Sequence, residues 1–311
     1  MNIAPFSSPG RFWRGNLHTH SLRSDGHLSP NEVCTFYREA GYDFLALTDH
    51  FMERYGFPIT DTRPDRTPGF TTILGAELHT GQAEFGQLWH ILAVGLPEDF
   101  APNLPGETGP EIAARALEAG AFVAAAHPAW YGLTEADIRS LGPIHAVEVF
   151  NGTAVDHNDK ADSWYVLDLL LRRGMHYNAC ATDDAHFSPE RQDRLLGWVN
   201  VKSKALDPEA LLNALKAGDY YSSTGPRIDS IDVTPGDRVS VRCSPANRVW
   251  VTGEGSLASA ERPRGDAAGI TEAQFDLKPF TNSASIRVTV RDDTGGRAWS
   301  NPIWLADPQR G

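Results

Sequence analysis

Short apolar runs alternate with amphipathic stretches along most of the chain. The apolar runs have the length of buried strands and lie at residues 44–47, 72–77, 88–94, 122–127, 146–150 and 177–181. The amphipathic stretches predict helices at residues 30–40, 111–119, 133–141, 164–173 and 206–216. Because strand and helix alternate, we expect an α/β domain, most simply a barrel with its site at the carboxyl ends of the strands.

Beyond residue 226 the pattern changes to short alternating strands separated by turn-forming residues. They are expected at residues 228–233, 239–243, 248–252, 274–277, 286–290 and 298–304. The pattern predicts a small all-β, sandwich-like domain, so we divide the chain into residues 1–228 and 229–311. The second domain has no ligand cluster and no basic stripe in its sequence. We expect a packing or oligomerisation module, with a carbohydrate-binding or lid role as the alternative.

Composition narrows the class of partner. The 311-residue chain has a formal net charge of -12, which disfavours a nucleic-acid polymer or an anionic membrane surface as partner. A small anionic substrate fits, because bound divalent cations would reverse the local charge. Cys34, Cys180 and Cys243 are far apart and indicate free thiols in a reducing compartment. With no signal-like or membrane-spanning apolar segment in the sequence, we expect a cytoplasmic protein; its oligomeric state stays open.

Histidines and carboxylates recur where the predicted strands end. His18 and His20 alternate with Thr19, so in a strand both imidazoles face one side. Imidazole and carboxylate are the usual ligands of zinc, manganese and iron. The candidate ligands are His18, His20, Asp25, His50, Glu77, His90, His127, Asp184 and His186. Pro128 favours an extended backbone at His127.

Several of these residues form motifs. His18-x-His20, Thr48-Asp49-His50, the isolated Glu77, His127-Pro128 and Asp184-x-His186 follow one another along the chain. In this order they resemble the motifs of the PHP family (polymerase and histidinol phosphatase), over roughly residues 14 to 228. The resemblance implies a distorted (β/α)7 barrel with two or three divalent ions of zinc, manganese or iron. It assigns the first metal to His18, His20, Glu77 and Asp184, the second to Asp25, His50 and His186, and the third to His90 and His127, with Glu77 as the bridge.

The resemblance also bears on the reaction. The stretch at residues 16–20 together with a β-rich C-terminal part looks like the CehA/McbB-type metallohydrolases, a branch named for hydrolysis of a carbamate ester. The broader family implies phosphoester hydrolysis. We expect a phosphoesterase that acts on a small phosphorylated compound through a metal-bridging hydroxide. A carboxyl- or carbamate-ester hydrolase with the same metals, or a non-catalytic binding module, is the alternative.

Other site residues are assigned from charge and position. Asp183 and His79 are candidates for the leaving-group acid, with metal-bound water as the third possibility. Asp49 and Asp183 are expected to orient the metal-binding imidazoles. Four arginines are candidates for binding a substrate anion: Arg54, Arg191, Arg194 and Arg227. His145 and His157 have no role in this scheme, so their substitution is expected to change little.

Overall fold

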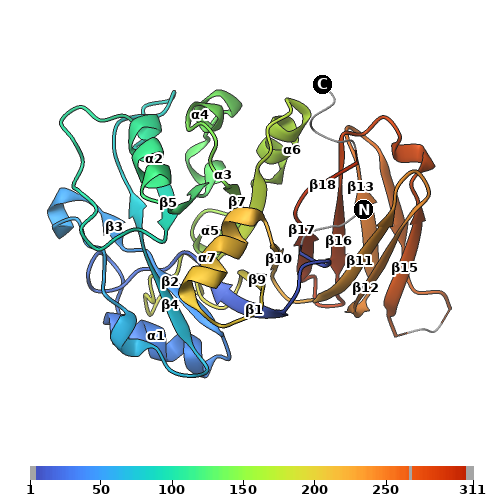
Figure 1. Ribbon diagram of the computed structural model, residues 1–311, viewed down its shortest axis with the longest axis horizontal. Helices are drawn as coiled ribbons and strands as arrows, with labels where there is room; N and C mark the ends of the chain where they lie inside the picture. The colour runs from blue at the N-terminus through green and yellow to red at the C-terminus, as the bar shows by residue number, and fades with distance from the viewer. Residues whose placement is uncertain (1–4, 266–267, 306–311) are drawn as a thin grey trace.

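The computed structural model of the protein describes residues 5–265 and 268–305 (Figure 1). The first part of the chain mixes strands and helices: β1 (Arg11–Asn16), α1 (Pro30–Glu39), β2 (Phe44–Leu47), β3 (His50–Phe51), β4 (Thr71–Leu78), β5 (Ile91–Val94), α2 (Gly109–Glu118), β6 (Phe122–Ala125), α3 (Pro128–Tyr131), α4 (Glu135–Ser140), β7 (Ala146–Asn151), α5 (Gly152–His157), α6 (Trp164–Arg172), β8 (Asn178–Thr182), β9 (Trp198–Ser203), α7 (Pro208–Ala217) and β10 (Tyr220–Ser223). The remaining strands are β11 (Ile228–Thr234), β12 (Arg238–Ala246), β13 (Arg248–Thr252), β14 (Ala258–Glu261), β15 (Ile270–Asp276), β16 (Ser285–Arg291), β17 (Arg297–Ser300) and β18 (Ile303–Trp304).

Every predicted strand and helix is present, with some ends shifted. The expected strand at residues 88–94 begins only at Ile91, and the expected helix at 133–141 is the shorter α4. The expected strand at residues 298–304 is divided into β17 and β18. Strands β3, β9, β10 and β14 and the short helices α3 and α5 were not predicted. None of the helices in the described part of the chain has the length and apolar character needed to span a bilayer.

Helix α1 shows how local sequence sets an element. Ser29 is its N-cap, the Ser29 side chain accepts from the Glu32 backbone N–H, and the Glu32 carboxylate accepts from the Ser29 N–H at 2.8 Å. Pro30 occupies the first helical turn, where its missing N–H costs nothing. Val33 and Tyr37 pack in a core beside β2. This fixes the start of α1 and so one end of the loop that carries Asp25.

The large sheet combines parallel and antiparallel strands. Strands β1, β2 and β4 are parallel neighbours, as are β6, β7 and β8, but β5 runs antiparallel to both β4 and β6. The chain passes from β4 to β5 without a helix, which allows the antiparallel arrangement. On the other side of β1, strands β9 and β10 are also antiparallel.

The sheet forms no continuous ladder between β8 and β1 in the described residues. The two strands approach each other just beyond their ends, where Thr19 and Ala185 form a single parallel bridge. There His20 N–H donates to Ala185 O at 2.9 Å, and Asp184 N–H donates to His18 O at 2.8 Å. The structure therefore shows a mixed α/β fold, and the closed (β/α)7 barrel stays a prediction.

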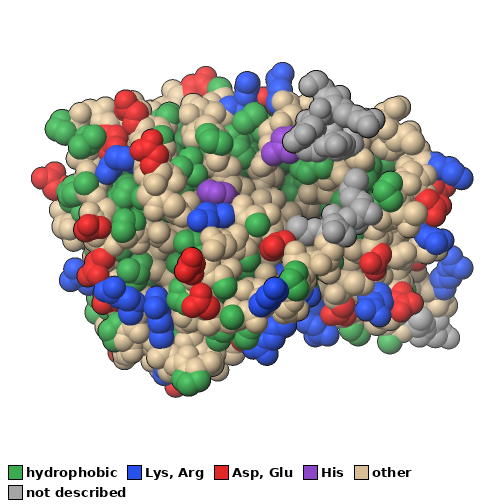
Figure 2. Space-filling model, in the orientation of Figure 1, with side chains coloured by type: hydrophobic (Ala, Val, Ile, Leu, Met, Phe, Trp, Pro, Cys, Tyr) green, Lys and Arg blue, Asp and Glu red, His purple; other side chains and the backbone are tan. Residues whose placement is uncertain are grey.

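Beyond residue 226 the described residues form strands and one 3₁₀ turn, as the sequence predicts. Strand β10 pairs with β17, so the large sheet continues through β16, β13 and β14. Strands β11, β12 and β15 form a separate three-stranded sheet. Side chains of both sheets, among them Val241, Phe275, Val249 and Val288, pack in one core. Figure 2 shows acidic and basic side chains interspersed over the visible face.

The chain returns across the predicted domain boundary near residue 301. The buried Asn301 amide donates to Gly218 O at 3.1 Å and Tyr220 O at 3.0 Å, and its carbonyl accepts from Ala179 N–H at 3.0 Å. Trp299 packs in the core of the α/β part. Because this segment contacts both parts, the division at residue 228 stays a prediction. Residues 266–267 and 306–311 of the predicted second domain lie outside the described residues.

Candidate metal centre

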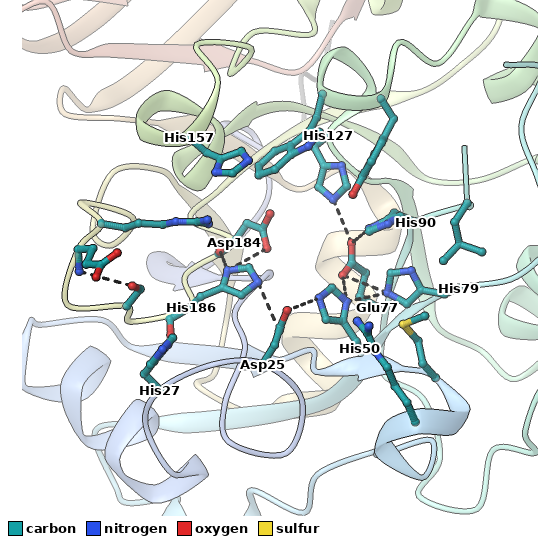
Figure 3. Close-up of a pocket in the computed structure, with 18 residues that line it drawn as sticks. Asp25, His27, His50, Glu77, His79, His90, His127, His157, Asp184 and His186 are labelled. Carbon is teal, nitrogen blue, oxygen red and sulfur yellow. Dashed lines mark hydrogen bonds and ion pairs between the residues drawn. The ribbon is translucent and has the colours of Figure 1, made fainter. Parts of the chain in front are cut away.

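The nine candidate ligands lie together where strands of the large sheet end. Figure 3 shows the seven that line the cavity, which are all but His18 and His20. His18 and His20 follow β1, Asp25 lies in the loop before α1, His50 begins β3, Glu77 lies in β4, His90 precedes β5, His127 precedes α3, and Asp184 and His186 follow β8. Their nitrogen and oxygen atoms form overlapping groups, in each of which the atoms lie within 4.8 Å of one another. His79 joins His50, Glu77 and His90 in one of these groups.

Glu77 is the centre of the cluster. Its Oε1 lies 2.8 Å from His90 Nδ1, 3.0 Å from His127 Nε2 and 3.5 Å from His18 Nε2, and its Oε2 lies 2.6 Å from His50 Nδ1 and 3.3 Å from His79 Nε2. Burial acts to raise the pKa of Glu77, but the surrounding histidines outweigh burial and hold this pKa well below its usual value. An ionised carboxylate that faces imidazoles on both sides can be shared between two cations.

Asp25 closes the cluster on another side. Its Oδ2 lies 3.3 Å from His50 Nε2, and its Oδ1 lies 3.5 Å from His186 Nε2 and 3.9 Å from His20 Nδ1. The next residue, Gly26, lies against the backbone of His20, where an added Cβ would stand 2.6 Å from the carbonyl carbon. A glycine is therefore required for the Asp25 loop to approach the cluster this closely.

Two candidate ligands adopt a left-handed backbone, Asp184 with φ of 55° and His127 with φ of 28°. The prediction that Pro128 holds His127 extended is wrong. The chain turns at His127 from β6 directly into α3, and the Glu148 carboxylate accepts from its N–H at 2.6 Å. Left-handed residues other than glycine cost about 1–3 kcal/mol and cluster at functional sites. At both positions the turn brings the side chain into the cluster.

The residues fit divalent cations. His18 Nε2 and Glu77 Oε2 are buried and form no hydrogen bond of good geometry with the described residues, although Asp184 Oδ1 lies 3.2 Å from His18 Nε2 and His50 Nδ1 lies 2.6 Å from Glu77 Oε2. A buried polar atom without a partner costs about 1–3 kcal/mol. His50 Nδ1 and His79 Nε2 also face each other at 2.7 Å. Convergent nitrogen and carboxylate donors of this kind are the ligand set of zinc, manganese and iron.

Glu148 in β7 is a site residue that the sequence reasoning missed. Its buried carboxylate lies 2.9 Å from His18 Nδ1, accepts from Asn151 Nδ2 at 3.0 Å and pairs with the Thr182 hydroxyl, in addition to its bond with His127. Burial acts to raise the pKa of Glu148, but His18 and His127 outweigh it and lower this pKa. The ionised carboxylate can only accept, so His18 donates from Nδ1 and presents Nε2 to the cluster. The sequence feature that could have identified Glu148 is its position as a carboxylate inside an otherwise apolar strand.

The first two histidines differ in charge. Burial acts to lower the pKa of His18, but the carboxylates of Asp184, Glu148 and Glu77 together raise it well above its usual value. Burial, followed by the charges of His186 and His50, lowers the pKa of His20 to about 4. His18 therefore holds a proton beside these carboxylates, and a bound cation would take the place of that proton.

Asp49 and Asp183 form no direct hydrogen bond with an imidazole among the described residues. Asp49 is linked to one through Ser24, whose hydroxyl donates to Asp49 Oδ1 at 2.8 Å and lies 3.4 Å from His20 Nδ1. The expectation that the two aspartates orient the ligands stays a prediction. Asp49 accepts from Ser21 N–H at 2.7 Å and from nearby hydroxyl groups. Asp183 accepts from the Tyr37 hydroxyl at 2.7 Å and from three successive backbone N–H groups at residues 195–197. Burial raises the pKa of Asp183 to about 6, against these hydrogen bonds. Asp183 is buried away from the cavity, which does not fit a leaving-group acid.

Of the remaining candidate residues, some line the cavity beside the cluster and others lie outside it. The cluster opens into a cavity of about 520 Å³, and Arg54 and Arg191 line it together with His79. Arg194 does not line the cavity but donates to Arg191 O at 2.7 Å. Arg227 is exposed and lies 3.6 Å from Asp229, so the structure does not bring it to the site. Burial lowers the pKa of His79, whose imidazole lies within the ligand cluster.

Aromatic residues that the sequence reasoning passed over form part of the cavity wall. Trp130, Tyr131 and His157 line it. The Trp130 and His157 rings are stacked, with centroids 4.8 Å apart and an interplanar angle of 15°. His157 was given no role from the sequence, whereas Figure 3 shows it beside the cluster. Burial, with the carboxylates of the cluster, raises the pKa of Tyr131 to about 12.

No protein-family model matches the sequence, and no curated protein shows significant sequence similarity to it. Among solved structures, the fold is similar to that of a two-domain protein from Bacteroides vulgatus containing a predicted PHP-like metal-dependent phosphoesterase. The two sequences are 14% identical, the TM-score is 0.53, and the similarity covers 97% of this chain and 99% of that chain.

Two further structures are less similar. One is a candidate metal-dependent phosphoesterase from Bifidobacterium adolescentis, with 14% identity and a TM-score of 0.44. The other is an amidohydrolase from Chromobacterium violaceum, with 18% identity and a TM-score of 0.40. Each similarity covers 58% of this chain and 89% of that chain. The likeness to the Bacteroides vulgatus protein extends over nearly the whole chain, so the fold it shares includes the β-only part.

Proposed function

We propose that the protein is a metal-dependent phosphoesterase that hydrolyses a small phosphorylated compound. The observation that carries the proposal is the buried Glu77 carboxylate, which faces imidazoles on both sides at the base of a cavity lined by two arginines. The similar fold of the Bacteroides vulgatus protein, which contains a predicted PHP-like metal-dependent phosphoesterase, supports the same class. The closed barrel, the CehA/McbB-type branch and the cytoplasmic location stay predictions from the sequence.

The proposed metal ligands keep the sets that the PHP resemblance implies. The overlapping groups in the structure agree with them only in part, because they place His127 with His18 and Asp184, and His90 with His50, Glu77 and His79. We assign the first metal to His18, His20, Glu77 and Asp184, the second to Asp25, His50 and His186, and the third to His90, His127 and Glu77. His79 shares a group with His50, Glu77 and His90, which makes it a further candidate ligand rather than a free acid. Divalent ions bound here would acidify a water molecule and offset negative charge on the phosphoryl oxygens.

The side chains of the cavity supply the rest of the mechanism. Glu148 fixes the His18 ring so that Nε2 faces the cluster. Arg54 and Arg191 line the same cavity, and we assign their guanidinium groups the role of pairing with a phosphate as it enters. The Trp130 and His157 stack gives part of the wall a flat aromatic surface. These residues bind and orient the ester.

Metal-dependent hydrolysis tests the proposal. The protein is stripped with a chelator and reloaded with manganese, zinc or iron. The assay then compares p-nitrophenyl phosphate and bis(p-nitrophenyl) phosphate with an aryl acetate and an aryl carbamate. We expect phosphoester turnover that returns only with metal and is lost in Glu77→Gln. His176→Ala is the matched control, because His176 stacks on Trp304 outside the cavity.

The other outcomes identify the alternatives. Turnover of the carbamate or the carboxyl ester alone would replace phosphoester hydrolysis by the chemistry of the CehA/McbB-type branch. Tight metal binding without turnover of any ester would favour a non-catalytic binding module.

A further inference from the structure

Tyr131 carries a hydroxyl group at the edge of the metal-ligand cluster. It is the last residue of α3, four positions after His127. Its ring centroid lies 4.5 Å from that of His90 and 5.3 Å from that of His127. The side chain lines the cavity. An aromatic ring in contact with two candidate ligands places its hydroxyl close to where a substrate would meet the metals.

The fold holds Tyr131 in place from both sides. Its short helix lies between two left-handed residues, His127 with φ of 28° and Gly132 with φ of 65°. Inside the helix, Ala129 N–H donates to the Ser163 hydroxyl at 3.0 Å. The Tyr131 ring packs against the core of the α/β part. The hydroxyl is therefore preorganised, which is what an electrostatic contribution to catalysis requires.

The hydroxyl has no partner of its own, since no other described residue makes a hydrogen bond with it. The contacts of its ring with His90 and His127, and its place in the lining of the cavity, put the side chain on the cluster side of the wall. Arg54 and Arg191, which also line the cavity, carry full charges on long side chains. Tyr131 instead offers a neutral donor on a fixed ring.

We propose that the Tyr131 hydroxyl donates a hydrogen bond to a non-bridging phosphoryl oxygen of the substrate and strengthens that bond as charge develops in the transition state. The inference rests on the proposed function and adds a catalytic residue to it. The phenol keeps its proton throughout, so the role does not depend on titration. Water attacks phosphorus, the P–O bond to the leaving group breaks, and the proton lost by the water passes to the departing alcohol or to solvent. Tyr131 only stabilises the charge on the phosphoryl group.

Tyr131→Phe removes the hydroxyl and keeps the ring, so the core and the contacts with His90 and His127 are preserved. With p-nitrophenyl phosphate and reloaded protein we expect kcat to fall about 10- to 100-fold, the usual effect of losing one bond to a charged acceptor. KM and metal content should stay within about twofold. Ligand binding gives a second readout. Tyr131→Phe should bind orthovanadate, which resembles the transition state, about tenfold or more weakly than the wild type does, and its affinity for inorganic phosphate should fall clearly less.

Tyr165→Phe is the control, because Tyr165 is 78% exposed on α6 and does not line this cavity. Unchanged kcat and vanadate affinity in Tyr131→Phe, beside an active wild type, would overturn the inference and leave the proposed function standing. A loss of bound metal in Tyr131→Phe would also overturn it, because the residue would then support the ligands. A wild type that neither turns over the phosphoester nor binds phosphate would refute the proposed function and the inference together.

Discussion

Replacing Glu148 by glutamine tests whether the buried carboxylate sets which nitrogen of His18 faces the cluster. Glu148 accepts from four groups: His18 Nδ1, the Thr182 hydroxyl, His127 N–H and Asn151 Nδ2. Glutamine keeps one oxygen and puts an NH₂ group in place of the other. The amide can therefore satisfy the donors on one side of the original carboxylate but not on both.

The two amide orientations differ in cost. If the NH₂ group faces His127 and Asn151, the His127 N–H and the Asn151 NH₂ group both lose their acceptor. Each unsatisfied buried donor costs about 1–3 kcal/mol of stability. Asn151 cannot turn round freely, because its Oδ1 accepts from Ala154 N–H at 2.9 Å as the cap of α5. If the NH₂ group faces His18 and Thr182, the hydroxyl can rotate to accept and His18 can move its ring proton to Nε2. The second orientation is the less costly.

The expected result of Glu148→Gln is therefore a folded protein whose His18 presents a protonated Nε2 to the metal. Loss of such an outer carboxylate typically weakens metal binding about 10- to 100-fold, or about 1.4–2.8 kcal/mol. Calorimetric titration of stripped protein with manganese or zinc measures the effect, and unfolding in chelator separates it from a loss of stability. Metal affinity within twofold of the wild type, in a folded variant, would refute the orienting role.

Three further changes test other parts of the account. Burial, and then Lys216, lowers the pKa of His145 to about 4. Between about pH 6.5 and 4 the unfolded chain binds a proton at His145 that the folded protein does not bind, so the free energy of unfolding should fall as pH falls through this window. We expect this fall to be about 1–2 kcal/mol larger in the wild type than in His145→Gln, as measured by urea unfolding. Asn301→Ala removes three buried hydrogen bonds and should cost about 2–4 kcal/mol of unfolding free energy, against a negligible change in the exposed Asn282→Ala. Arg191→Ala should raise KM for p-nitrophenyl phosphate about 3- to 10-fold, and equal KM values in Arg191→Ala and Arg227→Ala would contradict phosphate binding by Arg191.

Local sequence predicted those features that depend on neighbouring residues. The cap of α1 by Ser29 and Glu32 is formed as expected, because it needs only residues three positions apart. The meeting of the nine candidate ligands was also predictable. Most of them follow or end apolar runs, and such ends gather at one edge of a sheet. Asp25 lies in a loop instead, and His90 precedes β5, which brings it to the same edge because β5 is antiparallel. The direction of β5 was not predictable, because a short apolar run is equally compatible with parallel and antiparallel pairing.

The missed site residues depend on contacts between distant segments. Glu148 reads as a single charge in an apolar strand, and only its 2.9 Å contact with His18 reveals a role. Asp183 stands next to Asp184 in the sequence, yet the two side chains point to different surroundings, one to Tyr37 and one to the cluster. The backbone at His127 was mispredicted because a tight turn into α3 overrides the usual preference before proline.

The metal content of wild type and Glu77→Gln tests whether Glu77 is the centre of a site for several metal ions. Both proteins would be stripped, reloaded with manganese, desalted and analysed by inductively coupled plasma mass spectrometry, with circular dichroism to show that both are folded. We expect two or three equivalents in the wild type and at least one fewer in Glu77→Gln, because the shared carboxylate is lost. Less than one equivalent in the wild type, or equal contents in the two proteins, would contradict a metal centre built around Glu77.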